Sequence, residues 1–588
     1  MRHCGTNWAR NAHICYAKYG YNEASCESIH VVQDADSKSI NKSVDKYIKE
    51  LDFMNPDQIM SAFIDSHVAT IEPLAREAAL AGWEFQTTSS ESAKAQVTEL
   101  TGRIRKVYSD PEKFALLKSL PADQLADPRV ARQHTLLTRE FLSSQMTDAV
   151  IEEMTALEVD IEESYNTYRA IVNGKPVSDN EIDDILMTSD DVVLRHAAWT
   201  GSKGVGAHVA DRVLTLIRMR NREAQKLGFA NYYAMGLEMQ ELDETRLFAI
   251  LDDLAERSEP LWNSYRSELD TELAARFGIS VSDIRPWHHA NRFFQSPGNG
   301  EADLDRFFAD KDIAELTGTF FAAIGLPVED LLQKADLYER EGKCQHAFCM
   351  DVDRKGDIRV LCNNRPNERW MGTTLHEFGH AVYDKFNDPE LPFLLRGPAH
   401  TLTTESIALY MGRLNKDARW LRIYAGVEAT EAERIAAMAK REVRDYLLVF
   451  MHWCLVMTNF ERGMYTDPDQ DLDVLWWSLV KKYQKIELPE SERPPHAWAS
   501  KIHLASAPVY YQNYQLGEMV ASQLLHHIET VVLAGEPADA SVTSPKVGAY
   551  MIEWLFVPGA IRSWEQWLEH ATSETLNPDY FVKQLADG

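Results

Sequence analysis

Apolar residues recur at spacings of three and four along most of the chain, which is the period of an α-helix. This pattern begins at about Ser43 and is clear over Gln58–Ala81. Later helices are predicted around Val192, over Ala207–Leu227, over Asp243–Phe277, over Thr404–Leu414, over Glu431–Arg462, over Leu472–Tyr483 and from Val509 to the end. The pattern predicts a mostly-α fold in which residues 43–588 form one helical body.

The clearest strand signal lies in residues 345–363. Two short apolar runs, Ala347–Val352 and Ile358–Cys362, flank the polar stretch Asp353–Asp357, which is typical of a β-hairpin. We therefore expect a small antiparallel β element directly before the next helix. A strand edge there could hold an extended peptide through main-chain hydrogen bonds.

Residues 1–42 lack this periodicity and are rich in cysteine, asparagine and serine. We interpret them as a disordered or irregular leader ahead of the helical body. They lack the apolar segment of a secretory signal, and no run in the chain approaches the ~18 apolar residues of a membrane span. The expected compartment is therefore the cytoplasm, with no membrane span.

Composition narrows the possible partners. The 588 residues include 61 Lys and Arg against 90 Asp and Glu, which gives a net charge of −29. Nucleic-acid binding calls for a basic face, so we exclude a nucleic-acid partner. The seven cysteines form no C-x-x-C pair, which argues against a cysteine zinc site. Cys344 and Cys362 are expected as packed thiols, with a disulfide between them as the alternative.

One short segment, the H-E-x-x-H motif of His376, Glu377 and His380, carries a recognisable chemistry. Two histidines four residues apart lie on one face of a helix and can bind one metal ion. The glutamate projects toward the same cavity, where it can take a proton from a water molecule. This pattern is typical of zinc peptidases, so one Zn²⁺ per chain is expected.

A catalytic zinc site needs a third protein ligand beside its water. Phe386 occupies the position where a metzincin has its third histidine, which excludes that class. The candidates are Glu390, His400 and Glu405. Glu390 lies in a turn too close to the motif and His400 lies in a loop, whereas Glu405 begins an apolar helix that could pack beside the first. We favour Glu405; its alternative role is to complement the dipole of its helix.

A second polar cluster lies far from the motif, in residues 500–514. Its members could donate hydrogen bonds to a substrate or to a developing oxyanion. They are Lys501, His503, Tyr510, Tyr511 and Tyr514. Each of them alone is more often structural, and their density is what makes them candidates.

Several segments in consistent order resemble the angiotensin-converting-enzyme family of zinc dipeptidyl carboxypeptidases (peptidyl-dipeptidase A). The resemblance covers nearly the whole chain after residue 40. Its segments are Ala81–Phe85, Cys344–Ala347, the metal motif, Leu395–Gly397 leading to Glu405, Trp476–Leu479, Lys482–Gln484, and Lys501–His503 followed by Tyr511 and Tyr514. It implies a helical ellipsoid with a deep central groove, a lid of N-terminal helices and the β element beside the zinc helix.

The resemblance also implies roles for individual residues. Zinc would be held by His376, His380 and Glu405, while Glu377 would act as general base and then as the acid that protonates the leaving amine. The oxyanion would be stabilised by His503 and Tyr514. The substrate would be bound by His346 and Ala347 at its backbone, and by Lys501 with Tyr510 or Tyr511 at its C-terminal carboxylate.

Three features depart from that family's pattern. The tyrosine segment has one residue more than expected between Pro508 and Tyr514, so Tyr510 and Tyr511 compete for one role. Gln512-Asn513 stands where the family has a chloride-binding arginine, so chloride activation is not expected. Residues 305–315 contain no clear counterpart of the family's carboxylate-binding glutamine, which weakens the prediction of dipeptide release more than that of peptide hydrolysis.

We therefore expect a zinc metallopeptidase that acts on short peptides and releases C-terminal dipeptides. The segment Tyr510–Glu518 also resembles the thimet-type oligopeptidases, so internal cleavage is the alternative. A non-catalytic peptide-binding protein is the alternative from another class, but such proteins typically lose a ligand or the base, and here none is missing. The sequence does not predict the oligomeric state.

Overall fold

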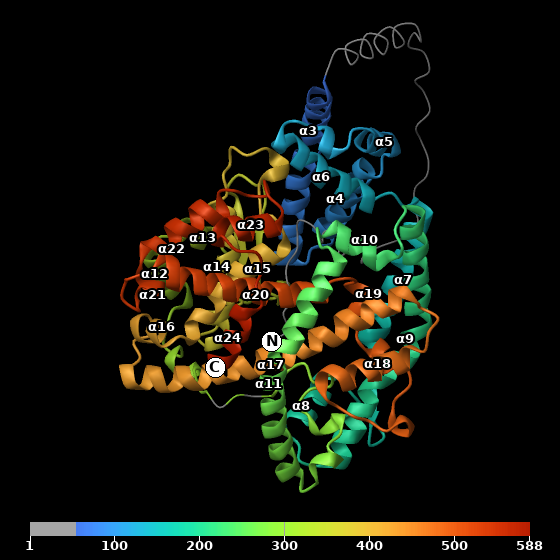
Figure 1. Ribbon diagram of the computed structural model, residues 1–588, viewed down its shortest axis with the longest axis vertical. Coiled ribbons are helices and arrows are strands. Elements are labelled where there is room, and N and C mark those ends of the chain that lie inside the picture. Colours follow the sequence, from blue (N-terminus) through green and yellow to red (C-terminus); the bar gives the residue numbers. More distant parts are fainter. Residues whose placement is uncertain (1–54, 299, 301, 588) are drawn as a thin grey trace.

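Helices dominate the structure, a computed structural model that describes residues 55–298, 300 and 302–587 (Figure 1). Within that part of the chain, the sheets are two short antiparallel hairpins. The predicted mostly-α fold is thus confirmed. The predicted leader, residues 1–42, and the predicted helix start at Ser43 lie outside the described residues.

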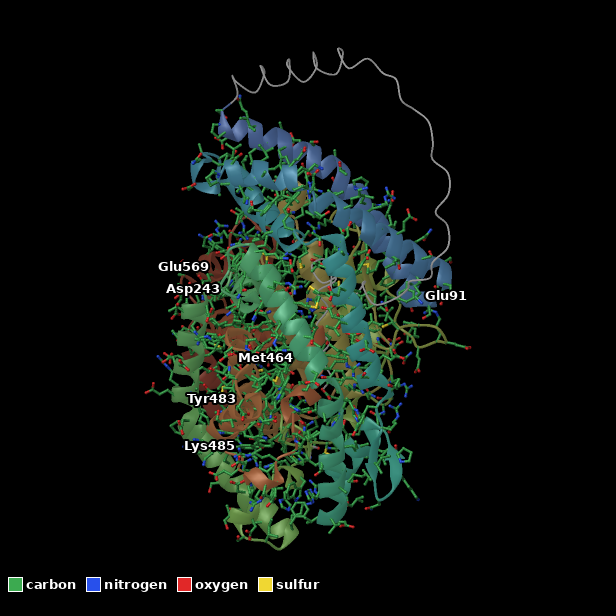
Figure 2. All side chains as sticks on the ribbon, turned by 90° about the vertical axis from the view of Figure 1, so that its right-hand side faces the viewer. Glu91, Asp243, Met464, Tyr483, Lys485 and Glu569 are labelled. Atoms are coloured by element: carbon green, nitrogen blue, oxygen red, sulfur yellow. The ribbon has the colours of Figure 1, made fainter. Side chains whose placement is uncertain are left out.

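Four helices gather at the N-terminal end, at the top of Figure 1: α3 (Pro56–Thr88), α4 (Glu91–Tyr108), α5 (Pro111–Ser119) and α6 (Pro128–Ser143). Figure 2 shows α3 running obliquely across the top of the molecule toward Glu91, where α4 begins. A capping box starts α3, because Asn55 Oδ1 accepts from the Gln58 N–H at 2.9 Å and Gln58 Oε1 accepts from the Asn55 N–H at 3.0 Å. These are the helices that the resemblance predicts as a lid.

The rest of the chain surrounds one large apolar core. Its first half contains α7 (Asp148–Thr167), α8 (Asp179–Thr188), α9 (Val192–Lys226), α10 (Tyr232–Met239) and α11 (Glu244–Phe277). The middle contains α12 (Ile313–Ala323), α13 (Glu329–Lys334), α14 (Glu368–Lys385), α15 (Thr401–Arg413), α16 (Ala418–Ile423), α17 (Ala429–Thr466) and α18 (Leu472–Leu479). The end contains α19 (His503–Ser506), α20 (Tyr511–His527), α21 (Ala540–Thr543), α22 (Pro545–Tyr550), α23 (Trp564–Thr572) and α24 (Asp579–Asp587).

The two helices predicted around Val192 and over Ala207–Leu227 are in fact one continuous helix, α9, of 35 residues. Glycine weakens a helix interior, so a glycine-containing stretch is an unfavourable place for it to continue. The structure gives Gly206 another role. A Cβ there would lie 2.2 Å from the His496 carbonyl oxygen, so the missing side chain lets the loop after α18 pack directly on α9.

Of the two hairpins in the described residues, one was predicted and one was not. The predicted one is formed by β3 (Phe348–Asp351) and β4 (Ile358–Leu361), and both strands pack against α14. A second hairpin, β1 (Ala170–Val172) with β2 (Lys175–Val177), was not predicted. Its turn, Asn173-Gly174, has φ of 51° and 77°, as a type I′ turn requires. Strands of three residues are too short to show an alternating pattern.

Two further predictions meet the structure here. Cys344 and Cys362 are not bridged to each other, so the alternative of a disulfide between them was wrong. None of the described helices combines the length and apolar character that crossing a bilayer requires.

Candidate active site

Helices α14 and α15 pack side by side and carry the predicted metal ligands (Figure 1). Gly379 allows the close approach, because a Cβ there would lie 2.8 Å from the Ala408 Cα. Since His376 and His380 flank this glycine, their side chains meet the first turns of α15, where Glu405 lies. The glycine in the motif is thus the reason that the two helices can bring three ligands together.

The three predicted ligands, His376, His380 and Glu405, converge in the structure, and we refer to these three side chains as the metal cluster. His376 Nε2 lies 3.7 Å from Glu405 Oε2, and His380 Nε2 lies 3.9 Å from Glu405 Oε1. One ligand atom from each residue lies within 4.8 Å of the other two. A tetrahedral zinc ion with bonds of about 2.1 Å separates its ligands by roughly 3.4 Å, so small side-chain movements would complete the site.

Thr404 fixes the orientation of one ligand. Its Oγ1 lies 2.7 Å from His380 Nδ1, which leaves Nε2 directed toward Glu405. A hydrogen bond to the second ring nitrogen sets the tautomer of a metal-binding histidine and raises its basicity. Thr404 was not predicted as a site residue, although its position directly before Glu405 in the sequence indicated that it lies near the metal ligands.

The buried polar atoms of this cluster fit a cation. His380 Nε2, Glu405 Oε1 and Glu377 Oε2 are buried and have no hydrogen-bond partner among the residues that the structure describes. Burial raises the pKa of Glu405 to about 7 and lowers the pKa of His380 to about 4. Burial and then the neighbouring Glu405 raise the pKa of Glu377 well above its usual value. A bound dication would favour the ionised carboxylates, and a neutral imidazole is the form that binds metal.

The second predicted cluster forms around Lys501. We refer to Lys501 with its neighbours Gln295 and Tyr511 as the Lys501 cluster. Lys501 Nζ donates to Gln295 Oε1 at 2.9 Å and faces three aromatic rings, with the ring centres of Phe293, Trp453 and Tyr511 at 5.1, 5.4 and 5.9 Å. Among the described residues, no carboxylate lies within ion-pair distance of Lys501, and burial lowers the pKa of its ammonium group to about 7. A buried cation without a counter-ion is unfavourable, so this place suits an anion from outside.

Gln295 is a residue that sequence reasoning missed. The glutamine of the resembled family was sought in residues 305–315, whereas Gln295 approaches Lys501 across 206 positions of sequence. The rings of both candidate tyrosines pack against Tyr514, at 5.1 Å for Tyr510 and 5.6 Å for Tyr511. Tyr511, which is 3% exposed, also lies 5.9 Å from Lys501 Nζ.

Tyr514 lies on the side of α20 that meets α15. Three residues later, Gly517 is so close to α15 that a Cβ there would lie 3.8 Å from the Glu405 Cβ. Glu518 forms an ion pair with Arg413 of α15. Residues three and four apart share a helix face, so Tyr514 belongs to the face of α20 that carries Gly517 and Glu518, and its ring packs 5.8 Å from that of Phe450 on α17.

His503 and the β3 segment complete the predicted residues. The His503 ring centre lies 5.2 Å from that of Tyr511, and its buried Nδ1 has no hydrogen-bond partner within the described ranges. Burial, and then Lys501, lower the pKa of His503 to about 3, so the ring is neutral. Exposed His346 and half-buried Ala347 lie directly before β3, the strand that packs on α14.

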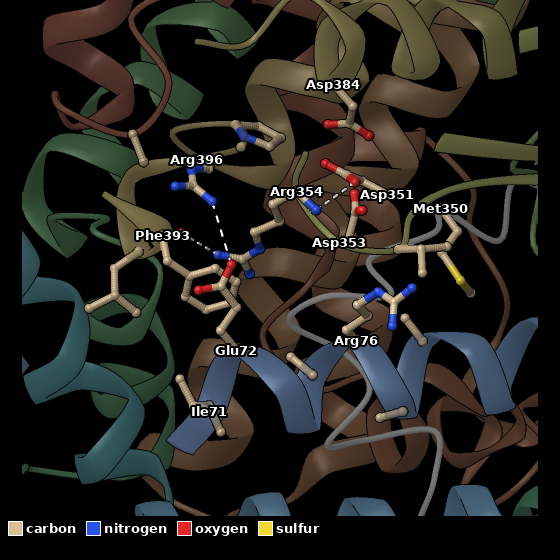
Figure 3. Close-up of a pocket in the computed structure, with 18 of the residues that line it drawn as sticks. Ile71, Glu72, Arg76, Met350, Asp351, Asp353, Arg354, Asp384, Phe393 and Arg396 are labelled. Carbon is tan, nitrogen blue, oxygen red and sulfur yellow. Dashed lines mark hydrogen bonds and ion pairs between the residues drawn. The ribbon is translucent and has the colours of Figure 1, made fainter. Parts of the chain in front are cut away.

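A cavity of about 290 Å³ lies between the N-terminal helices and α14 and reaches the metal cluster at His380 and Thr404 (Figure 3). Glu72 and Arg396 form an ion pair in the wall of this cavity, with 3.6 Å between Glu72 Oε1 and Arg396 Nη1. Asp384 lies one helical turn beyond His380 in the same wall. Among the predicted site residues, His380 lines this cavity.

Comparisons with known proteins agree with this geometry. The family model described as angiotensin-converting enzyme matches residues 55–285, and the model of peptidase family M3 matches residues 333–537, which hold the metal cluster. Thermostable carboxypeptidase 1 of Pyrococcus furiosus is 18% identical over 255 residues, which are 39% of this chain and 50% of that protein. The chain thus spans half the length of this relative. The predicted resemblance is confirmed: residues 55–285 are similar to the angiotensin-converting-enzyme family, and residues 333–537 are similar to peptidase family M3.

Proposed function

We propose that this protein is a zinc-dependent peptidase that releases dipeptides from the C-terminus of short peptides. The observation that carries the proposal is the convergence of His376, His380 and Glu405 within 4.8 Å, with the buried Glu377 beside them. The cavity that reaches His380 gives an extended peptide a route to these groups.

The chemistry divides between the metal and the chain. A zinc ion held by the two histidines and Glu405 would supply a Lewis acid and an activated water. Glu377 takes the proton of the attacking water and then gives it to the leaving amine. Tyr514 and neutral His503 donate hydrogen bonds to the oxygen that becomes negative in the transition state.

The dipeptide preference rests on the cluster around Lys501. Its ammonium group and the Tyr511 hydroxyl bind the C-terminal carboxylate, and the Gln295 side chain orients the lysine. Ala347 and His346, ahead of the edge strand β3, bind the peptide backbone. A carboxylate held at a fixed place relative to the metal selects one peptide bond for cleavage.

The test is the variant Glu377→Gln, which keeps the size of the side chain and removes the base. We expect it to retain zinc and to lose activity by at least ~10³-fold, as is typical for the loss of a general base. Zinc content by elemental analysis and turnover of short peptides by mass spectrometry measure both outcomes. Undiminished turnover in a zinc-loaded variant would contradict the assignment of Glu377.

Internal cleavage is a second candidate, because the M3 family model matches the part of the chain with the metal ligands. The name of the Pyrococcus relative, a carboxypeptidase, favours cleavage near the C-terminus instead. Peptides with an amidated C-terminus separate the two. A carboxylate-binding peptidase should cut them at least ~10-fold more slowly than the free acids, whereas an internal peptidase should cut both alike.

A further inference from the structure

The segment that leads to the two site tyrosines contains a backbone conformation that its residue type rarely adopts. Val509 has a φ of 54°, in the left-handed region, and is 1% exposed. A β-branched residue is strained there because its side chain crowds its own backbone. Such conformations persist only where neighbouring groups hold them, and they cluster at functional sites.

Three side chains hold the Val509 backbone. Glu461 Oε1, on α17, accepts from the Val509 N–H at 2.7 Å. The Val509 carbonyl accepts from Gln240 Nε2 at 2.8 Å and from Gln512 Nε2 at 2.6 Å. Because Glu461 and Gln512 are buried, water does not compete for these bonds.

The Val509 side chain and the start of the next helix are fixed by the same neighbours. A Cβ on Gly236 of α10 would lie 2.8 Å from Val509 Cγ2, so the valine fills the space that the glycine leaves. Asn513 Nδ2 donates to Gln240 Oε1 at 2.6 Å, which ties that glutamine to the first turn of α20. The N-cap residue of α20, Tyr510, provides no side-chain cap. The direction of this helix is therefore set at Val509.

We propose that Glu461, through the left-handed turn at Val509, positions Tyr511 and Tyr514 in the active site; this rests on the proposed peptide hydrolysis. The left-handed turn comes directly before α20, and both tyrosines lie in the first turn of that helix. The turn therefore fixes where the helix begins, and with it the position of Tyr511 beside Lys501 and of Tyr514 next to it.

Glu461 is a positioning residue, because it acts through the Val509 N–H and touches no reacting group. Glu461→Leu removes the acceptor, whereas Glu461→Gln keeps a side-chain oxygen for the same bond. Per folded, zinc-loaded molecule, we expect the leucine variant to lose about tenfold to a hundredfold in kcat/KM, with kcat lowered and KM raised. The glutamine variant should lose much less.

The matched control is Glu223→Leu. Glu223 is another buried glutamate, but it pairs with Lys226 on α9. Its loss should lower stability and leave kcat and KM per folded molecule unchanged. If Glu461 were merely structural, Glu461→Leu would behave like this control.

A second variant tests whether the effect passes through Val509. Glycine adopts the left-handed region without strain, so Val509→Gly in the Glu461→Leu background should recover a large part of the lost kcat/KM. The proposal is overturned if Glu461→Leu keeps the parent kcat and KM, or if its loss is unchanged by Val509→Gly. If the parent protein does not hydrolyse peptides, the proposed function fails, and this outcome is distinct from a failure of the positioning role. A crystal structure of Glu461→Leu with residues 509–514 unmoved would still overturn the positioning role.

Discussion

The metal cluster and the Lys501 cluster are built in opposite ways. The metal ligands come from two consecutive helices, α14 and α15, and two of them belong to one helix turn. The Lys501 cluster draws on separate segments, and its hydrogen bond to Gln295 spans 206 positions. Local helix geometry therefore dictates the first cluster, and the packing of the whole fold dictates the second.

The two clusters also differ in the sign of the charge that each of them lacks as a partner. At the metal cluster, His380 Nε2 and Glu405 Oε1 are buried acceptors without a donor in the described part of the chain, which calls for a cation. At the second cluster, no carboxylate of residues 55–298, 300 and 302–587 forms an ion pair with the buried Lys501, which calls for an anion. Under the proposed function, a bound zinc ion supplies the cation and the C-terminal carboxylate of a peptide supplies the anion. The comparison thus predicts that the first cluster governs kcat and the second governs KM.

Removal of a metal ligand should give the largest effect. In His380→Ala, two ligands remain, so we expect zinc to be lost and peptide turnover to fall by at least ~10³-fold. Elemental analysis and peptide turnover measure these outcomes. The control is His134→Ala, because the buried His134 bonds to the Leu117 carbonyl within the N-terminal helices. Full activity of a zinc-free His380→Ala protein would rule out the metal mechanism.

The sequence predicted the metal cluster because one helix period fixes two ligands and the base. Glu405 followed from the need for a third ligand on a second helix. Gln295 and the continuity of α9 could not be predicted in this way. Gln295 approaches Lys501 only through tertiary packing, and the close contact of Gly206 with the His496 carbonyl has no local signature.

The two hairpins show the same limit at the level of the fold. The β3–β4 hairpin was predicted from two apolar runs around a polar turn. The β1–β2 hairpin has strands of three residues, and only its Asn173-Gly174 turn carried a signal. Short elements therefore depend on turn chemistry more than on periodicity.

Removal of the Lys501 charge should affect binding more than chemistry. In Lys501→Met, we expect KM for free-acid peptides to rise by about 10²-fold with a much smaller change in kcat, because the carboxylate loses its counter-ion. Lys501→Arg keeps the charge and serves as the matched control. Steady-state kinetics on free-acid and amidated peptides measure the difference. An equal rise for both peptides would show that Lys501 does not bind the carboxylate.

Thr404→Val should weaken the metal site without removing a ligand. Valine has nearly the shape of threonine but cannot bond to His380 Nδ1, so the ring loses its fixed orientation. We expect zinc affinity to fall by about tenfold, as is typical when such a supporting group is lost. Competition with a chelator measures the affinity. Thr138→Val on α6 is a matched control, because Thr138 Oγ1 lies 3.4 Å from His134 Nε2 in the same kind of pair far from the metal. Unchanged affinity in Thr404→Val would mean that packing alone orients His380.

The smallest effect is a pH dependence of the Lys501 cluster, which the comparison of free-acid with amidated peptides separates from the titration of other groups. Burial, and then Arg292, lower the pKa of Lys501 to about 7 in the free protein. A bound carboxylate favours the ammonium form, so binding is strongest below pH 7 and weakens as the pH rises through that value. Between pH 7 and pH 8 the protonated fraction falls about fivefold, and kcat/KM for free-acid peptides should fall with it. Amidated peptides have no C-terminal carboxylate, so their kcat/KM should not depend on the charge of Lys501. The ratio of kcat/KM for amidated peptides to kcat/KM for free acids should therefore rise toward one over this interval. A ratio that does not change with pH would assign the carboxylate to a group other than Lys501.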